Sequence, residues 1–141
     1  NLDLSQYDIV FIENVGNLVC PASFDLGHHL NVTLLSVPEG DDKPAKYPVM
    51  FRSSDLVLIS KSDLLPILDD FQPERAKSYL RDIASTAPVI ELSAKDKSGM
   101  DQWFEWINQQ VEIRKTHVEQ HPVAAGHTHD HHHHEHEEAT T

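Results

Sequence analysis

The chain has 141 residues, of which 39% are hydrophobic, and this is enough for one compact domain with a core. It carries 23 acidic side chains against 11 basic ones, with a formal net charge of -12. Nucleic acids and anionic membrane surfaces bind basic surfaces, so neither is an expected partner. No apolar run approaches the roughly 18 residues of a membrane span, and we expect a cytoplasmic protein. Because the sequence begins with Asn1 rather than methionine, we also expect that a piece is missing upstream.

Four short apolar runs rich in Val, Ile and Leu are separated by segments that resemble helices or loops. They are continuous rather than alternating, which is typical of parallel strands covered on both faces. The predicted strands are Tyr7–Glu13, Val32–Val37, Asp55–Ser60 and Pro88–Ser93. We therefore predict an α/β fold, a doubly wound and mostly parallel sheet in three α/β/α layers, with ligands beyond the carboxyl ends of the strands.

Two stretches have helical periodicity. The first begins near Pro73, which suits an initial helical turn, and its predicted inner face consists of Ala76, Tyr79, Leu80, Ile83 and Ala84. The second closes the domain after a predicted capping box of Ser98 and Asp101, and its predicted apolar face consists of Met100, Trp103, Phe104, Ile107 and Val111. We expect both tryptophans to pack, Trp103 more firmly and Trp106 at the edge of this face.

The composition changes near Thr116. Residues 1–115 have the pattern of a folded domain, whereas residues 116–141 have little apolar periodicity and contain most of the eleven histidines. Closely spaced imidazoles on a flexible chain bind Ni²⁺, Cu²⁺ or Zn²⁺ with variable geometry. We therefore predict a disordered metal-binding tail, whose candidate ligands are His127, His129, His131, His132, His133, His134 and His136. A purification tag and a solvated tail without metal are the alternatives.

The predicted strand ends carry residues suited to a guanine nucleotide. Asp63 could accept hydrogen bonds from both N1–H and the exocyclic amine of guanine, a pair of donors that adenine lacks. The methylene stem of Lys61 could cover the purine face, and the backbone amide of Ala94 could donate to the guanine carbonyl. After the first run, Glu13 could hold a water of a Mg²⁺ shell, and Gly16 leaves room for its amide to approach a γ-phosphate.

Each of these short patterns is weak alone, but their order at successive strand ends is specific. Together with "ENVGNLVCP", "EGDDKPAKYP", "SKSDLLP" and "SAK", they resemble the hydrogenase maturation GTPases that deliver nickel, the HypB family. The resemblance runs from about Tyr7 to Ile113. The related urease-type GTPases share the strand-end patterns, but we expect a different stretch from them where this chain has "NLVCP".

The resemblance implies functional residues at matching positions. Cys20 matches a metal ligand of the family that works with an upstream Cys-His pair at a nucleotide-dependent dimer interface, and a thiolate suits Ni²⁺ or Zn²⁺. A buried, inert thiol is the alternative for Cys20. Ser93 and Lys95 complete the "SAK" pattern around the base. Lys43 could reach a nucleotide, including one bound by a partner subunit, or be an ordinary solvated lysine.

Two departures from the family pattern matter. Ser60 stands where the guanine signature has Asn, from which we expect weaker affinity with unchanged base choice. A G-x-x-x-x-G-K-[ST] phosphate loop is absent from the sequence. We therefore expect this chain to be the C-terminal part of a longer GTPase, and the isolated chain neither to bind GTP tightly nor to hydrolyse it.

The function expected from the resemblance is GTP-dependent nickel delivery for [NiFe] hydrogenase maturation. It implies GTP, Mg²⁺ and Ni²⁺ or Zn²⁺, a GTP-dependent homodimer, and contacts with a maturation partner and the hydrogenase large subunit precursor. A nucleotide-independent metal-storage module and a urease-type accessory GTPase are the alternatives.

Overall fold

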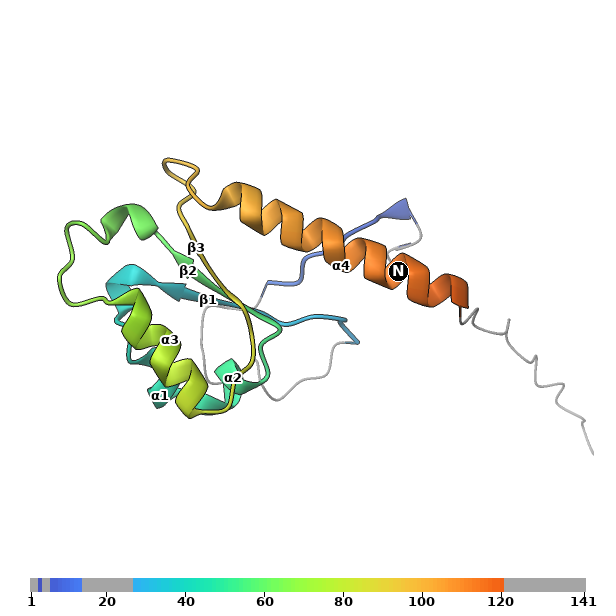
Figure 1. The fold of residues 1–141 in the computed structure, drawn as a ribbon. Coiled ribbons are helices and arrows are strands. Elements are labelled where there is room, and N and C mark those ends of the chain that lie inside the picture. Colours follow the sequence, from blue (N-terminus) through green and yellow to red (C-terminus); the bar gives the residue numbers. More distant parts are fainter. Residues whose placement is uncertain (1–2, 4–5, 14–26, 121–141) are drawn as a thin grey trace, which may run out of the picture.

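The structure is a computed structural model that describes residue 3 and residues 6–13 and 27–120. Strands and helices alternate along most of this part of the chain (Figure 1). The strands are β1 (Val32–Ser36), β2 (Leu56–Ser60) and β3 (Val89–Leu92). The α-helices are α1 (Lys43–Lys46), α2 (Pro48–Arg52), α3 (Pro73–Asp82) and α4 (Met100–Gln120), and short 3₁₀ helices are η3 (Val37–Glu39) and η4 (Ser62–Leu64). The predicted α/β class is confirmed.

The three strands form a parallel sheet in the order β1-β2-β3. Their register aligns Ser36 with Ser60 and Ser60 with Leu92, so all three strands end at the same edge. This edge is where the predicted nucleotide residues follow β2 and β3. The three later apolar runs were therefore predicted as strands correctly, within one residue at every boundary.

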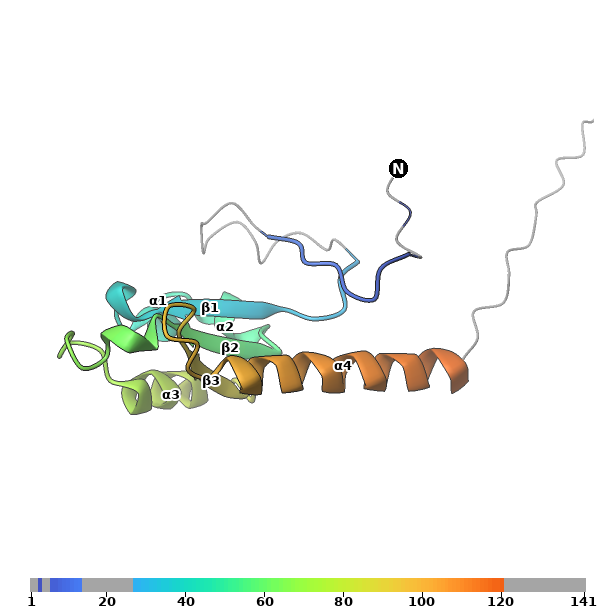
Figure 2. The same ribbon diagram turned by 90° about the horizontal axis from the view of Figure 1, so that it is seen from above.

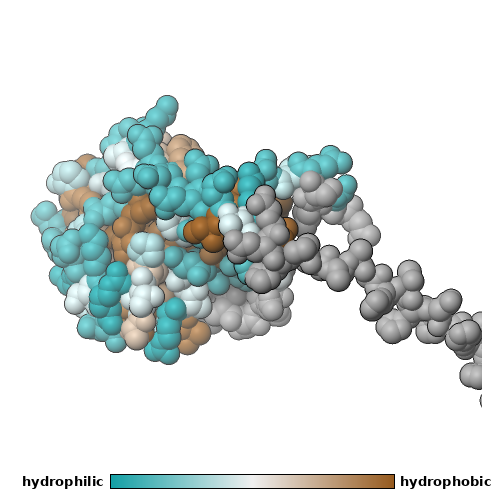
Figure 3. Space-filling view, turned by 45° about the vertical axis from the view of Figure 1, so that its right-hand side comes forward, coloured by the Kyte–Doolittle hydropathy of each residue, from teal (hydrophilic) through white to brown (hydrophobic). Residues whose placement is uncertain are grey.

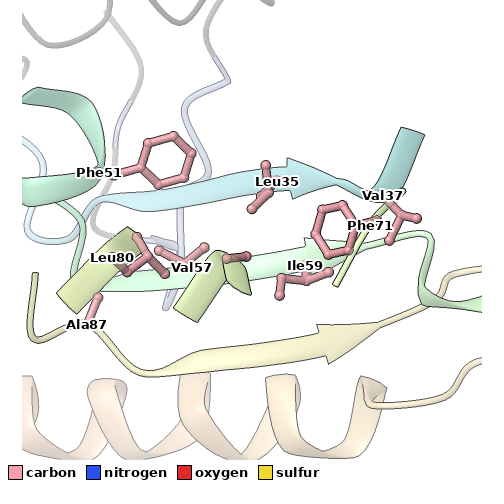
Figure 4. Packing of buried hydrophobic residues seen from close by; sticks show 9 residues of the cluster. Leu35, Val37, Phe51, Val57, Ile59, Phe71, Leu80 and Ala87 are labelled. Atoms are coloured by element: carbon pink, nitrogen blue, oxygen red, sulfur yellow. The ribbon is translucent and has the colours of Figure 1, made fainter. Parts of the chain in front are cut away.

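One face of the sheet is covered by α1, α2 and α3 (Figures 1 and 4). The buried cluster there consists of Leu35, Val37, Phe51, Val57, Ile59, Phe71, Ala76, Leu80 and Ala87. Pro73 opens α3, and Ala76 and Leu80 are one turn apart, which points both toward the strands. Burial of this apolar surface holds the helices against the sheet.

The other face is covered by α4, which begins beside the end of β3, runs back along the sheet and projects beyond it (Figure 2). Met100, Trp103 and Trp106 pack on a buried cluster of Leu56, Leu58, Ile90 and Leu92. The two indole rings stack, with centroids 5.8 Å apart and planes at 15°. Within the described residues, no helix is both long enough and apolar enough to cross a bilayer.

Tyr7–Glu13 is not a strand, contrary to the prediction. Its apolar side chains remain exposed, and the ring of Phe11 lies 6.5 Å from that of Trp103, at an interplanar angle of 47°. The segment therefore contacts the aromatic surface of α4 instead of pairing with a strand.

In β1, Leu34 is 58% exposed because α4 covers β2 and β3 but leaves the outer strand open. In the space-filling view of Figure 3, hydrophobic residues (brown) are visible at the surface between hydrophilic residues (teal).

The helix predictions were wrong at several individual positions. Ala84 lies beyond α3, exposed and in the left-handed conformation, because the helix ends in a C-terminal turn at Ile83. On α4, Phe104 is 52% exposed, contrary to the prediction, because the face that packs on the sheet is centred on Met100, Trp103 and Trp106; both tryptophans pack there, as predicted. The predicted capping box is also wrong, since the Ser98 hydroxyl donates to Asp96 and α4 begins after Gly99. In addition, α4 continues past Thr116 to Gln120.

Candidate functional site

The carboxylate of Asp63 is tied to the neighbouring strand end by Ser93. Asp63 lies in η4, directly after β2, and Ser93 directly follows β3. The Ser93 hydroxyl donates to Asp63 Oδ1 at 2.7 Å. Ser93 is fully buried and the Asp63 side chain is 15% exposed, so this hydrogen bond is partly shielded from water and orients the carboxylate. The structure thus brings together two residues that lie thirty positions apart in sequence.

Ser93 also organises the turn after β3. Its oxygen accepts hydrogen bonds from the backbone amides of Lys95, at 3.1 Å, and Asp96, at 3.4 Å. One hydroxyl therefore holds both the carboxylate and the "SAK" turn. Ala94, between these anchored residues, is exposed, which suits a backbone contact with a ligand.

Asp96 provides a second anchor for this turn that the sequence analysis did not identify. Its Oδ1 accepts from the backbone N–H of Ser98 at 2.9 Å and from the Ser98 hydroxyl at 2.7 Å. The backbone hydrogen bond from Ser98, with the hydroxyl bond, holds the pKa of Asp96 below its usual value. The Asp-x-Ser spacing was the available signal, because Asp side chains commonly bond to the amide two residues later.

Lys61 has an unusual backbone conformation at the end of β2. Its φ is 59° and its ψ is 41°, which places the backbone in the left-handed region that residues other than glycine rarely adopt. This turn starts η4 and directs the chain so that Asp63 faces Ser93. The Lys61 side chain is exposed at the same edge as the carboxylate, as its expected role over a purine face requires.

Lys95 lies near the other oxygen of the Asp63 carboxylate. The distance from Lys95 Nζ to Asp63 Oδ2 is 3.8 Å, and the lysine side chain is 82% exposed. A pair this open to water contributes little stability, so the lysine can move away at small cost. Oδ2 has no closer side-chain donor among the described residues, and it is the oxygen best placed for an incoming ligand.

Lys43 opens α1 on the loop that follows β1. Its ammonium lies over the ring of Tyr47, 5.4 Å from the centroid, a cation–π contact. The preceding Asp41 is buried and bound to Arg75, an interaction that the sequence pattern did not reveal. Contacts between η3 and η4 bring the loop after β1 beside the loop that carries Asp63.

The remaining predicted site residues are not assembled in the described structure. Glu13 is exposed. Gly16, Cys20 and the candidate tail ligands from His127 to His136 lie outside the described residues. Within the described ranges, no group of three or more His, Cys, Asp or Glu side chains could hold a metal ion. The described geometry is therefore that of the residues around Asp63 and Ser93.

The sequence and the fold were next compared with those of known proteins. Residues 2–91 match the family described as the CobW/HypB/UreG nucleotide-binding domain. The chain belongs to the CobW/HypB/UreG family. It is 51% identical to the hydrogenase maturation factor HypB of Azotobacter vinelandii over 113 residues, which are 80% of this chain and 37% of the relative. It is 50% identical to the HypB of Escherichia coli K12 over 109 residues, 77% of this chain and 37% of the relative.

Solved structures of the family share the fold. The crystal structure of HypB from Helicobacter pylori in complex with nickel superposes with a TM-score of 0.67 and 39% identity, over 71% of this chain and 46% of that one. HypB from Archaeoglobus fulgidus gives a TM-score of 0.64 and 36% identity, over 69% of this chain and 47% of that one. The chain thus spans less than half the length of these relatives.

Proposed function

We propose that this chain is the base-recognition part of a GTPase that delivers nickel during hydrogenase maturation. The observation that carries the proposal is the Asp63 carboxylate, fixed by Ser93 at one oxygen and open at the other. Such a carboxylate can accept from guanine N1–H and the exocyclic amine, and it would select guanine over adenine. Lys61, Ala94 and Lys95 lie around it and would contact the ring face and the carbonyl edge.

The assignment to hydrogenase maturation is supported by the names of the relatives. The Azotobacter and Escherichia proteins are hydrogenase maturation factors, and the Helicobacter pylori structure contains nickel. In our proposal the nickel ion, or zinc in its place, is cargo held by Cys20 with upstream ligands, and GTP hydrolysis with Mg²⁺ in a dimer controls its release. Glu13 and Gly16 would act near the γ-phosphate. The complete protein would work in the cytoplasm with a maturation partner and the hydrogenase large subunit precursor.

The proposal also assigns this chain an incomplete nucleotide site. The phosphate-loop signature is missing from its sequence, so the isolated chain would not hydrolyse GTP. Calorimetry with GTP and Mg²⁺ should show no micromolar binding to the isolated chain. Micromolar binding would contradict the assignment as an incomplete site.

The histidines of the tail favour metal storage as a second candidate function. The two functions are distinguished by nickel binding to a longer protein that includes the upstream part, with and without residues 121–141. Pure storage predicts that nearly all bound nickel is lost with the tail. Nickel delivery predicts that a site persists after truncation and is lost on Cys20→Ala, so a retained site that is insensitive to that substitution would contradict the metal role of Cys20.

A further inference from the structure

The two aspartates that precede Lys43 are each bound to a different cation. Asp42 Oδ2 lies 2.6 Å from Lys46 Nζ, and Asp41 Oδ2 lies 2.7 Å from Arg75 Nη2. Within the described residues, Lys43 has no carboxylate within ion-pair distance and lies over the Tyr47 ring instead. A lysine in a strongly acidic chain is thus left available for an anion from outside.

Asp41 fixes the backbone just before Lys43. It is 4% exposed, and its Oδ2 accepts hydrogen bonds from the Gln72 backbone amide at 2.8 Å and from Arg75 Nε at 2.7 Å, with Arg75 Nη2 at ion-pair distance, 2.7 Å. A buried carboxylate loses its hydration, and these donors offset that cost. The contacts fasten the turn after η3 to the start of α3.

The position of Lys43 depends on this attachment. The α1 helix is a single turn, too short to be stable alone, and its amides bond back to Asp42 and Lys43 carbonyls. Its packing against α3 and the Asp41 contacts are what hold it in place. An ammonium on a flexible stem is a point charge without a preferred direction, so its reach is set largely by the backbone that carries it.

We propose that Asp41 is a positioning residue which, together with Arg75, fixes the turn that presents the Lys43 ammonium to a phosphate group of the nucleotide. The proposal rests on the proposed function, because the anion is a phosphate of the guanine nucleotide recognised at Asp63. In this proposal Asp41 does not contact the ligand, since the residue is buried and its Oδ2 is bound to Gln72 and Arg75.

The test is side-chain NMR of the full chain at millimolar nucleotide, where weak contacts remain visible. The ring of Tyr47 should shift the ε-methylene signal of Lys43, and guanosine diphosphate should move it further. Guanosine, which lacks phosphates, should move the Ala94 amide but not Lys43. Asp41→Asn should abolish most of the Lys43 response while the Ala94 response persists. Arg75→Lys, which keeps the charge but loses the guanidinium fork, should have the same effect.

Asp42→Asn is the matched control, because it removes the neighbouring ion pair with Lys46 without touching the buried anchor. It should leave the Lys43 response nearly unchanged. A well-dispersed amide spectrum in every variant would show that the fold persists. An equal loss in Asp42→Asn, or an unchanged response in Asp41→Asn, would overturn the positioning role. A response at Ala94 with none at Lys43 would overturn the inference alone, and no response at either position would overturn the proposed function as well.

Discussion

Ser93 Oγ lies 2.7 Å from Asp63 Oδ1, and this hydrogen bond joins the ends of two adjacent parallel strands. Because the Ser93 hydroxyl also accepts from two backbone amides, the carboxylate and the turn beside it form one unit. In the proposed function, recognition of the base would therefore depend on a buried hydroxyl that does not itself touch the ligand edge.

Ser93→Ala should weaken the discrimination of guanine from adenine. The substitution leaves Asp63 Oδ1 without its donor and frees the turn, a loss of about 1–2 kcal/mol, which corresponds to roughly tenfold in a binding ratio. The measurement is the ratio of guanosine to adenosine diphosphate affinities from NMR titration. Ser53→Ala, which removes an exposed hydroxyl bonded to Met50, is the control. An unchanged ratio in Ser93→Ala would show that Asp63 is positioned without the hydroxyl.

Ala84→Gly should stabilise the protein. Ala84 has φ 59° after α3, where the Ser85 amide bonds to the Leu80 carbonyl and the Ala84 amide bonds to that of Arg81. This is the Schellman turn, in which glycine is preferred. Relief of the left-handed conformation outweighs the added flexibility of glycine, so we expect a gain of about 0.5–1 kcal/mol. Urea unfolding measures it, and Ala45→Gly, in the exposed part of α1, should instead destabilise.

Gly99→Ala should loosen α4 from the sheet. Gly99 has φ +69°, and a Cβ there would lie 2.0 Å from the Glu91 carbonyl oxygen, so the backbone must shift. Gly27 has φ +70° with no atom within 4 Å of such a Cβ, which makes Gly27→Ala a control for backbone strain alone. We expect Gly99→Ala to cost about 1–3 kcal/mol more than Gly27→Ala in urea unfolding. Equal costs would mean that the close approach to β3 is unimportant.

Asp96 should contribute a pH-dependent part of the stability. Its pKa is lowered in the folded chain, first by the Ser98 backbone hydrogen bond. A carboxyl with a depressed folded pKa stabilises the fold above its unfolded pKa, which is about 3.9, and loses that contribution as the pH falls through the lower folded value. Asp96→Asn should therefore show a smaller fall in urea midpoint below about pH 4. Asp69→Asn, whose carboxylate has no partner among the described residues, should follow the parent chain.

The sequence predicted the part of the site that depends on strand order. Continuous apolar runs identified β1, β2 and β3, and parallel strands must end at one edge, which placed Asp63 near Ser93. The Asp41–Arg75 attachment was not predictable, because it joins a loop to the first turn of α3 by tertiary contact, and the "EGDDKPAKYP" pattern that contains Asp41 does not indicate its partner.

The errors arose where local pattern and tertiary packing differ. Tyr7–Glu13 has the composition of a strand, yet a strand also needs a paired neighbour, and here Phe11 contacts Trp103 instead. On α4, the helical period was right but its phase was not, because the sheet accepts the stacked Trp103 and Trp106 rings and leaves Phe104 exposed.

Base preference tests the central claim most directly. Asp63→Asn replaces an acceptor-only carboxylate by an amide that also donates, and this suits xanthine, which has a carbonyl where guanine has an amine. NMR titration of the parent chain should show guanosine diphosphate preferred over xanthosine diphosphate, and the variant should reverse the order. If both proteins kept the same preference, or neither distinguished the bases, Asp63 would not be the residue that recognises guanine.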